Sequence, residues 1–170
     1  CEYCGACYSD AQGRYITNRK NCYIPANSIS LSDETAEAGA DGKIAVNLDS
    51  NYGIWALGLE VAFDAEALTL KGIESGIFSA DEISYSVNDG VITIFVENAE
   101  VADIADTGAA FYLVFEGGVA GEYAIEAELI ADNTINVSSE NVVFAIENGS
   151  LVIAHVCDLE YNAPVEASCH

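Results

Sequence analysis

Apolar residues alternate with polar or small residues through most of the chain between residues 44 and 154. The clearest run places Trp55, Leu57, Leu59, Val61 and Phe63 two positions apart. Successive side chains of a strand point to opposite faces, so this period predicts strands with one buried face. A helix would repeat its apolar residues every three or four positions, and no long stretch does so. The pattern therefore predicts an all-β fold with little helix.

Turn-forming residues separate the alternating runs, and nine short strands are expected. Asn88-Asp-Gly90 between two runs is a strong hairpin signal, because Asp-Gly favours the tight turn that matches strand twist. Two antiparallel sheets that each bury one face form a β-sandwich, in which Trp55 is expected to face inward. The expected strands cover residues 44–48, 55–63, 68–74, 83–87, 91–97, 110–116, 122–130, 142–146 and 150–154.

The charge of the chain limits its partners. The 170 residues are 51% hydrophobic, which is ample for one core, but the formal net charge is -23. Residues 30–154 contain 23 acidic residues and only two basic ones, Lys43 and Lys71. So much negative charge argues against binding to nucleic acid or anionic lipid and favours basic partners. No run approaches the roughly 20 apolar residues of a membrane helix.

Composition divides the chain into three segments. Residues 1–26 are rich in Cys and carry the basic residues Arg14, Arg19 and Lys20, residues 27–154 hold the predicted sandwich, and residues 155–170 form a tail with Cys and His. The basic first segment and the acidic sandwich should attract one another or attract neighbouring copies. An even number of cysteines near the ends suits an oxidising, extracellular setting.

The two ends could bind zinc or form disulfides. Close Cys and His pairs at opposite ends could together supply the four ligands of a tetrahedral zinc site. Cys7 and Cys22 could close a loop between them, and three structural disulfides without metal explain the six cysteines equally well. The candidate metal or disulfide residues are Cys1, Cys4, Cys7, Cys22, His155, Cys157, Cys169 and His170.

The sequence offers no catalytic set. A nucleophilic triad needs a base beside the nucleophile, and no His occurs before His155. The chain also has no phosphate-binding loop, dinucleotide fingerprint, HExxH motif or EF-hand loop. The oxygen-rich clusters at residues 49–53 and 132–136 are interpreted as turns rather than calcium sites. We therefore expect no catalytic residues, no required cofactor and a protein that is not an enzyme.

Three stretches of the sequence resemble the cohesin family. The stretch from Leu57 to Gly76 (LGLEVAFDAEALTLKGIESG) is similar to an amphipathic strand that ends in aromatic-Asp, followed by a short turn, a second strand and Gly. Residues 106–115 (DTGAAFYLVF) and 148–153 (NGSLVI) resemble two later strands of the family in the expected order. The resemblance covers about residues 40–153. It implies a nine-stranded jelly-roll sandwich that binds dockerin modules.

The resemblance also implies a recognition face on the outer side of one sheet. Carried onto this chain, the face is formed by strands 54–63, 83–88, 91–97 and 121–130. Many cohesins have polar Asn or Asp where this chain has Ala56 and Gly58, which indicates a divergent class or another partner. The expected partner-binding residues are Ala56, Gly58, Glu60, Tyr85, Val87, Thr93, Phe95 and Glu97.

Two functions fit these observations. The first is an extracellular or cell-surface scaffold module of bacterial type that binds a dockerin-like domain. The alternative is a structural bead of a surface fibre or adhesin, joined head-to-tail to neighbouring copies through its Cys-rich ends. A carbohydrate-binding sandwich fits less well, because such modules display exposed aromatic residues and the only Trp is placed inward.

Overall fold

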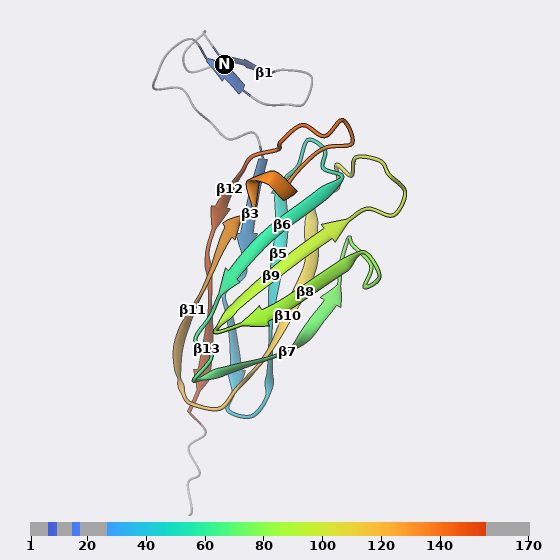
Figure 1. Cartoon of the computed structure of the whole chain (residues 1–170). Helices are drawn as coiled ribbons and strands as arrows, with labels where there is room; N and C mark the ends of the chain where they lie inside the picture. Colours follow the sequence, from blue (N-terminus) through green and yellow to red (C-terminus); the bar gives the residue numbers. More distant parts are fainter. Residues whose placement is uncertain (1–6, 10–14, 18–26, 156–170) are drawn as a thin grey trace, which may run out of the picture.

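The chain folds into a sandwich of two β-sheets (Figure 1). The computed structural model describes residues 7–9, 15–17 and 27–155. A two-stranded ribbon of β1 and β2 precedes the sandwich, and a short 3-10 helix, η1, interrupts it. The elements are β1 Cys7–Ser9, β2 Tyr15–Thr17, β3 Asn27–Leu31, β4 Glu34–Glu37, β5 Asp41–Ser50, β6 Ala56–Ala62, β7 Leu68–Ser75, β8 Ile83–Asn88, β9 Val91–Glu97, β10 Gly108–Gly117, β11 Gly121–Leu129, η1 Ala131–Asn133, β12 Phe144–Glu147 and β13 Gly149–Ala154.

The sandwich has the jelly-roll topology that the cohesin resemblance implies. One sheet has five strands in the order β12-β3-β5-β10-β7, and the other has six in the order β4-β13-β11-β6-β9-β8. All nine strands predicted from the alternating pattern are present. Consecutive strands repeatedly pass from one sheet to the other, so each sheet combines strands that are distant in the sequence.

Two further strands, β3 and β4, extend the predicted set. They are consecutive in the chain but lie in different sheets, where they pair in parallel with β12 and β13. The sandwich is therefore mixed rather than wholly antiparallel. β4 offers only one buried residue, Ala36, so its alternation is too weak to be seen in the sequence. These pairings place the first strands of the sandwich beside its last ones.

The core lies between the two sheets and consists of the predicted apolar faces. Leu59 and Val61 of β6 are fully buried beside Ile94 and Ile92 of β9. Phe111 of β10 is buried in the same cluster from the facing sheet. Strands that are each apolar on one side therefore close on a single interior, as alternation requires.

Trp55 does not join this core. Its side chain is half-buried, and its indole N–H donates a hydrogen bond to the carbonyl oxygen of Asn98 at 3.0 Å. Trp55 precedes β6, where the chain bonds to Ile135 rather than to a regular neighbouring strand. The expected inward position is therefore only partly realised.

The predicted hairpin at Asn88-Asp-Gly90 is confirmed. Asn88 pairs with Val91, which leaves a two-residue turn whose residues Asp89 and Gly90 have φ values of 47° and 78°. Two positive φ values define the turn type that matches the right-handed twist of the strands. A Cβ at Gly90 would also lie 2.7 Å from the carbonyl oxygen of Phe63, so glycine is required there.

Replacing Phe111 by Ala should strongly destabilise the sandwich. The side chain is fully buried, and its loss removes apolar burial and leaves a cavity between the sheets. We expect the free energy of unfolding to fall by about 3–5 kcal/mol, measured by urea denaturation. The exposed Val119 is the control, because Val119→Ala should change stability by less than about 0.5 kcal/mol.

Candidate protein-binding face

The four strands expected to form the recognition face lie side by side. They correspond to β11, β6, β9 and β8, which are consecutive neighbours in the six-stranded sheet. We call the side of these four strands that points away from the core the outer face. Its surface is set by the strand register, because paired residues of neighbouring strands point to the same side of a sheet.

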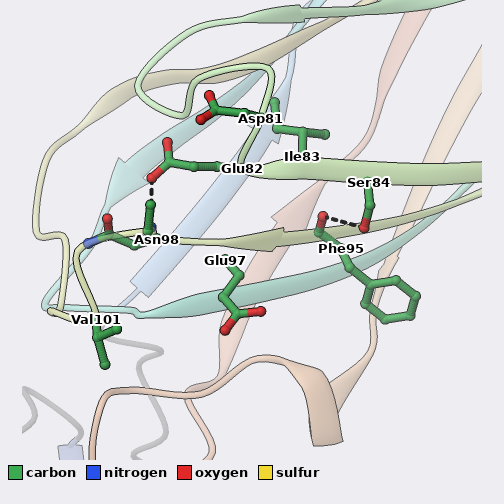
Figure 2. Close-up of a pocket in the computed structure, with 9 residues that line it drawn as sticks. Asp81, Glu82, Ile83, Ser84, Phe95, Glu97, Asn98 and Val101 are labelled. Carbon is green, nitrogen blue, oxygen red and sulfur yellow. Dashed lines mark hydrogen bonds between the residues drawn. The ribbon is translucent and has the colours of Figure 1, made fainter.

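Phe95 is the aromatic residue of the outer face. It pairs with Gly58 of β6 and Ser84 of β8, whereas its neighbours Ile94 and Val96 point into the core. The ring is 40% exposed although it lies on an inner strand of the sheet. Figure 2 shows Phe95 and Glu97 projecting to the same side of the sheet. An apolar ring is therefore presented to solvent between polar residues.

Tyr85 and Val87 do not share this face. The register pairs them with the buried Ile94 and Ile92, so they point to the core side of the sheet. They stay 46% and 47% exposed because β8 is the edge strand of its sheet. The Tyr85 hydroxyl reaches across towards β7 of the other sheet, where it lies 3.8 Å from the place of a Cβ on Gly72. The expectation that they join Phe95 is therefore wrong.

The outer positions of β8 belong instead to polar residues. Ser84, Ser86 and Asn88 pair with Phe95, Thr93 and Val91, and all three are exposed. The sequence did contain the signal for this arrangement. A two-residue turn places Asn88 opposite Val91, and counting back from that pair assigns every residue of β8 to its face.

The segment around η1 covers one end of the outer face. Ile130 donates its N–H to the carbonyl oxygen of Gly58 at 2.9 Å, and the Thr134 hydroxyl accepts the N–H of Gly58 at 3.1 Å. A Cβ on Gly58 would lie 2.8 Å from the Cβ of Asn133. Gly58 is therefore on the expected side but buried, and Ala56 beside it is half-buried. These two residues offer little surface to a partner.

Glutamates dominate the open part of the outer face. Glu60 on β6 lies directly opposite Glu128 on β11, and Glu126 is one position further along the outer side. With Val91 and Ala62 they line a shallow hollow of about 190 Å³. Like charges placed opposite one another repel, so this arrangement costs stability unless a cation approaches. The sequence prediction included strand β11 but did not name Glu126 or Glu128.

The two basic residues of the sandwich lie on the other sheet. Lys43 of β5 forms an ion pair with Glu74 and sits 4.7 Å from the centre of the Tyr112 ring. Lys71 of β7 pairs with Glu116 at 2.6 Å. Within residues 27–155, no basic residue lies on the outer face. Its glutamates are therefore not neutralised by that part of the chain.

A second hollow of about 340 Å³ lies where β8 and β9 meet their flanking loops (Figure 2). Phe95 and Glu82 are among the residues that line it. The Glu82 carboxylate accepts the backbone N–H groups of Ala99 and Ser79, each at 2.9 Å, and the Ser79 hydroxyl at 2.7 Å. These bonds, first that of Ala99, lower the pKa of Glu82 below its usual value. The hydrogen bonds therefore favour the ionised form of the Glu82 carboxyl.

The Cys and His residues of the ends are mostly outside the described part of the chain. Cys7 lies in β1 and the exposed His155 follows β13. Among the described residues no group of three His, Cys, Asp or Glu is placed to hold a metal, and none forms a helix able to cross a membrane. The candidate residues outside the described ranges are Cys1, Cys4, Cys22, Cys157, Cys169 and His170.

The oxygen-rich clusters at 49–53 and 132–136 are built into loops. The Asn51 amide donates to the carbonyl oxygens of Ile104 and Asp106 at 2.8 and 3.2 Å, which ties two loops together. The Asn136 side chain accepts the N–H groups of Ser138 and Glu140 within a tight turn. These side chains serve the turns that the sequence analysis assigns to them.

Comparison with known proteins gives a consistent set of structural relatives. A chain of the Coh-OlpA-Doc918 complex, a type I cohesin-dockerin complex from Clostridium thermocellum, superposes with a TM-score of 0.67 at 18% identity, covering 76% of this chain and 99% of that one. The seventh ScaB type I cohesin from Pseudobacteroides cellulosolvens gives 0.64 at 21%, covering 86% and 100%. A non-cellulosomal cohesin from the archaeon Archaeoglobus fulgidus gives 0.65 at 17%, covering 75% and 91%.

The chain has the cohesin fold. No family model and no curated protein matches its sequence, so the cohesin likeness rests on three-dimensional structure and on the three short motifs. The motif around Leu57–Gly76 forms β6, the following turn and β7. The closing motif at 148–153 lies in the turn and strand of β13. The cohesin-like motifs therefore lie on the strands that build both sheets.

Replacing Gly58 by Ala should disturb the contact between β6 and η1. The new Cβ would meet the Cβ atoms of Asn133 and Ile130 at 2.8 and 3.0 Å, so one segment must move. We expect a loss of about 1–3 kcal/mol in the free energy of unfolding. The control is Gly118→Ala, which has no atom within 4 Å of the new Cβ. Equal stabilities of the two variants would contradict the close packing described here.

The lowered pKa of Glu82 predicts a contribution to stability that depends on pH. Its hydrogen bonds stabilise the folded chain above the unfolded pKa of the carboxyl, and this contribution is lost as the pH falls through the folded pKa. Glu82→Gln should therefore lower stability at neutral pH and reduce the loss of stability in acid. Thermal unfolding at a series of pH values measures both effects. Glu97→Gln, in the same hollow, is the matched control.

Proposed function

We propose that this chain is a protein-binding scaffold module that holds a dockerin-type partner on its outer face. The observation that carries the proposal is Phe95, an aromatic residue that is 40% exposed on an inner strand of the sheet, beside the acidic part of the outer face. The structural relatives include cohesins described in complex with dockerins. We place the module in an extracellular or cell-surface setting of bacterial type, where the Cys-rich ends would be oxidised.

Recognition would combine one apolar anchor with an acidic surround. Phe95 would insert between partner side chains and lose its water, as aromatic anchors do at interfaces. Glu60, Glu126 and Glu128 would meet Lys or Arg residues of the partner and relieve their mutual repulsion. The attraction would speed association at low salt and weaken as salt is added. Binding of this kind needs no cofactor and no catalytic group.

The footprint on this chain would differ from that of cohesins with polar residues at the Ala56 and Gly58 positions. Here η1 and its flanks occupy that end of the face. A partner would therefore contact the serines of β8, the outer side of β9 and the acidic half of β6 and β11. Because this contact surface includes the glutamates of β6 and β11, a dockerin-like domain with a basic surface would fit it.

Phe95→Ala should weaken partner binding by more than about 1 kcal/mol, because a buried aromatic anchor contributes most at the centre of an interface. The measurement is calorimetry or surface plasmon resonance with a panel of purified dockerin modules, including Doc918. Tyr52→Ala is the control, since Tyr52 is an exposed aromatic outside the outer face.

Two results would contradict this assignment. If Phe95→Ala and the wild type bind one dockerin equally well, the outer face is not the site. If no dockerin with a basic surface binds the wild type at low salt, the partner class is wrong. Each variant should be measured at several salt concentrations. The salt dependence of the affinity then gives the electrostatic contribution to binding in the same experiment.

A further inference from the structure

The edge strand β8 has a free side. It pairs with β9 through all of its residues, and no other described strand bonds to it. The hydrogen bond from the N–H of Glu97 to the carbonyl oxygen of Glu82, at 3.0 Å, fixes which pairs of this ladder are bonded. Bonded and non-bonded pairs alternate in an antiparallel ladder. The backbone N–H and C=O groups of Ile83, Tyr85 and Val87 therefore point away from β9, as a template for another strand.

β8 lacks the protection that the other sheet edges carry. β4 has charged Glu34 and Glu37, and β7 has Lys71, Glu74 and a register shift against β10. β12 has only four residues. β8 is six residues long, regular in register, and contains no charge and no proline. Charges, bulges, prolines and short length are the usual means by which proteins block strand addition, and β8 uses none of them.

The core side of β8 also leaves apolar surface uncovered. Tyr85 and Val87 point inward but remain about half exposed, because β8 is the last strand of its sheet among the described residues. An added strand would cover these side chains in the same step in which it pairs with the free backbone groups. Strand addition is a common mode of recognition in which the backbone supplies affinity and alternate side chains supply specificity.

The charges around β8 indicate what kind of strand would fit. Asp81 and Glu82 precede the strand and Asp89 follows it. In the chain's own sequence, the strand β2 (Tyr15–Thr17) is preceded by Arg14 and followed by Arg19 and Lys20. In an antiparallel pairing, two basic residues would lie near Asp81 and Glu82, and one would lie near Asp89. The order and number of charges therefore match.

β2 also needs a larger sheet to join. Among the described strands it pairs only with β1, over three residues, in a separate two-stranded ribbon. A ribbon this small is at best marginally stable alone in water. The residues Tyr, Ile and Thr all favour strands. β2 and its basic flanks are therefore complementary to β8, which is itself uncharged but has acidic residues at both ends.

We propose that the β8 edge accepts β2 of a second copy of this chain, which adds as an antiparallel strand and links copies head to tail. The contact uses a different part of each copy, so it can continue into a filament rather than close on itself. It leaves the outer face open, and so it is independent of the dockerin-type binding proposed above. The same module could then bind a partner while it is joined to its neighbours.

The test is sedimentation velocity of the full chain with reductant, over a wide concentration range at low salt. Wild-type protein should self-associate, and Val87→Lys should weaken the association by at least about tenfold, because a cation at the edge repels the basic segment. Val143→Lys is the matched control: Val143 and Val87 are 46% and 47% exposed, and the charge change is the same. Arg19→Glu with Lys20→Glu should also prevent association.

A peptide supplies a second readout. The labelled peptide of residues 13–21 (GRYITNRKN) should bind the wild-type chain in fluorescence anisotropy, and a scrambled peptide should not. Val87→Pro removes an N–H that points away from β9, so it should block the peptide and leave the ladder intact. Circular dichroism checks that each variant is folded, and Val87→Lys serves if the proline variant is not.

The proposal is overturned if the wild type stays monomeric throughout, or if Val87→Lys associates like Val143→Lys. Its failure is separable from failure of the dockerin proposal. Phe95→Ala should self-associate like the wild type, and Val87→Lys should bind any dockerin that the wild type binds. Loss of both activities in either single variant would mean that the two surfaces are not independent.

Discussion

The turn of Asp89 and Gly90 fixes the register of β8 against β9, and the surfaces of the six-stranded sheet follow from that register. A slip by one residue would exchange the two faces of β8, because side chains alternate along a strand. The core resists a slip along β9 as well, since Ile94 is packed between the sheets while Phe95 beside it is in solvent. Local turn chemistry and core packing thus select the same pairing.

The outer face carries two features that do not stabilise the fold. An apolar ring is held in water at Phe95, and Glu60 faces Glu128 across a strand pair. The sandwich tolerates both because its core is continuous and its buried polar side-chain atoms all have hydrogen-bond partners within the described residues. The stability of the fold therefore comes from the interior between the sheets, and the outer face contributes little to it.

Much of the fold could be predicted because alternation reports burial directly. β4 could not, since Ala36 is its only buried residue. The sequence analysis placed Phe95 on the correct side of the sheet, but it misplaced Tyr85 and did not foresee that Gly58 is covered. Tyr85 was assigned to the wrong side because β8 was considered without its turn. The two-residue turn pairs Asn88 with Val91, and this pairing places Tyr85 opposite the buried Ile94. The cover over Gly58 depends on contacts between residues more than seventy positions apart, which no local pattern reveals.

The positions of Lys43 and Lys71 make the charge distribution of the sandwich asymmetric. Both cations of residues 27–155 lie on the five-stranded sheet, each paired with an acid, while the opposite sheet turns unbalanced carboxylates outward. In the field of a positively charged surface such a body experiences a torque within about a Debye length, roughly 8–10 Å at physiological salt. Adsorbed on an amine-coated support, the molecules would settle with their acidic side down, so an assay built that way would hide the surface it was meant to probe.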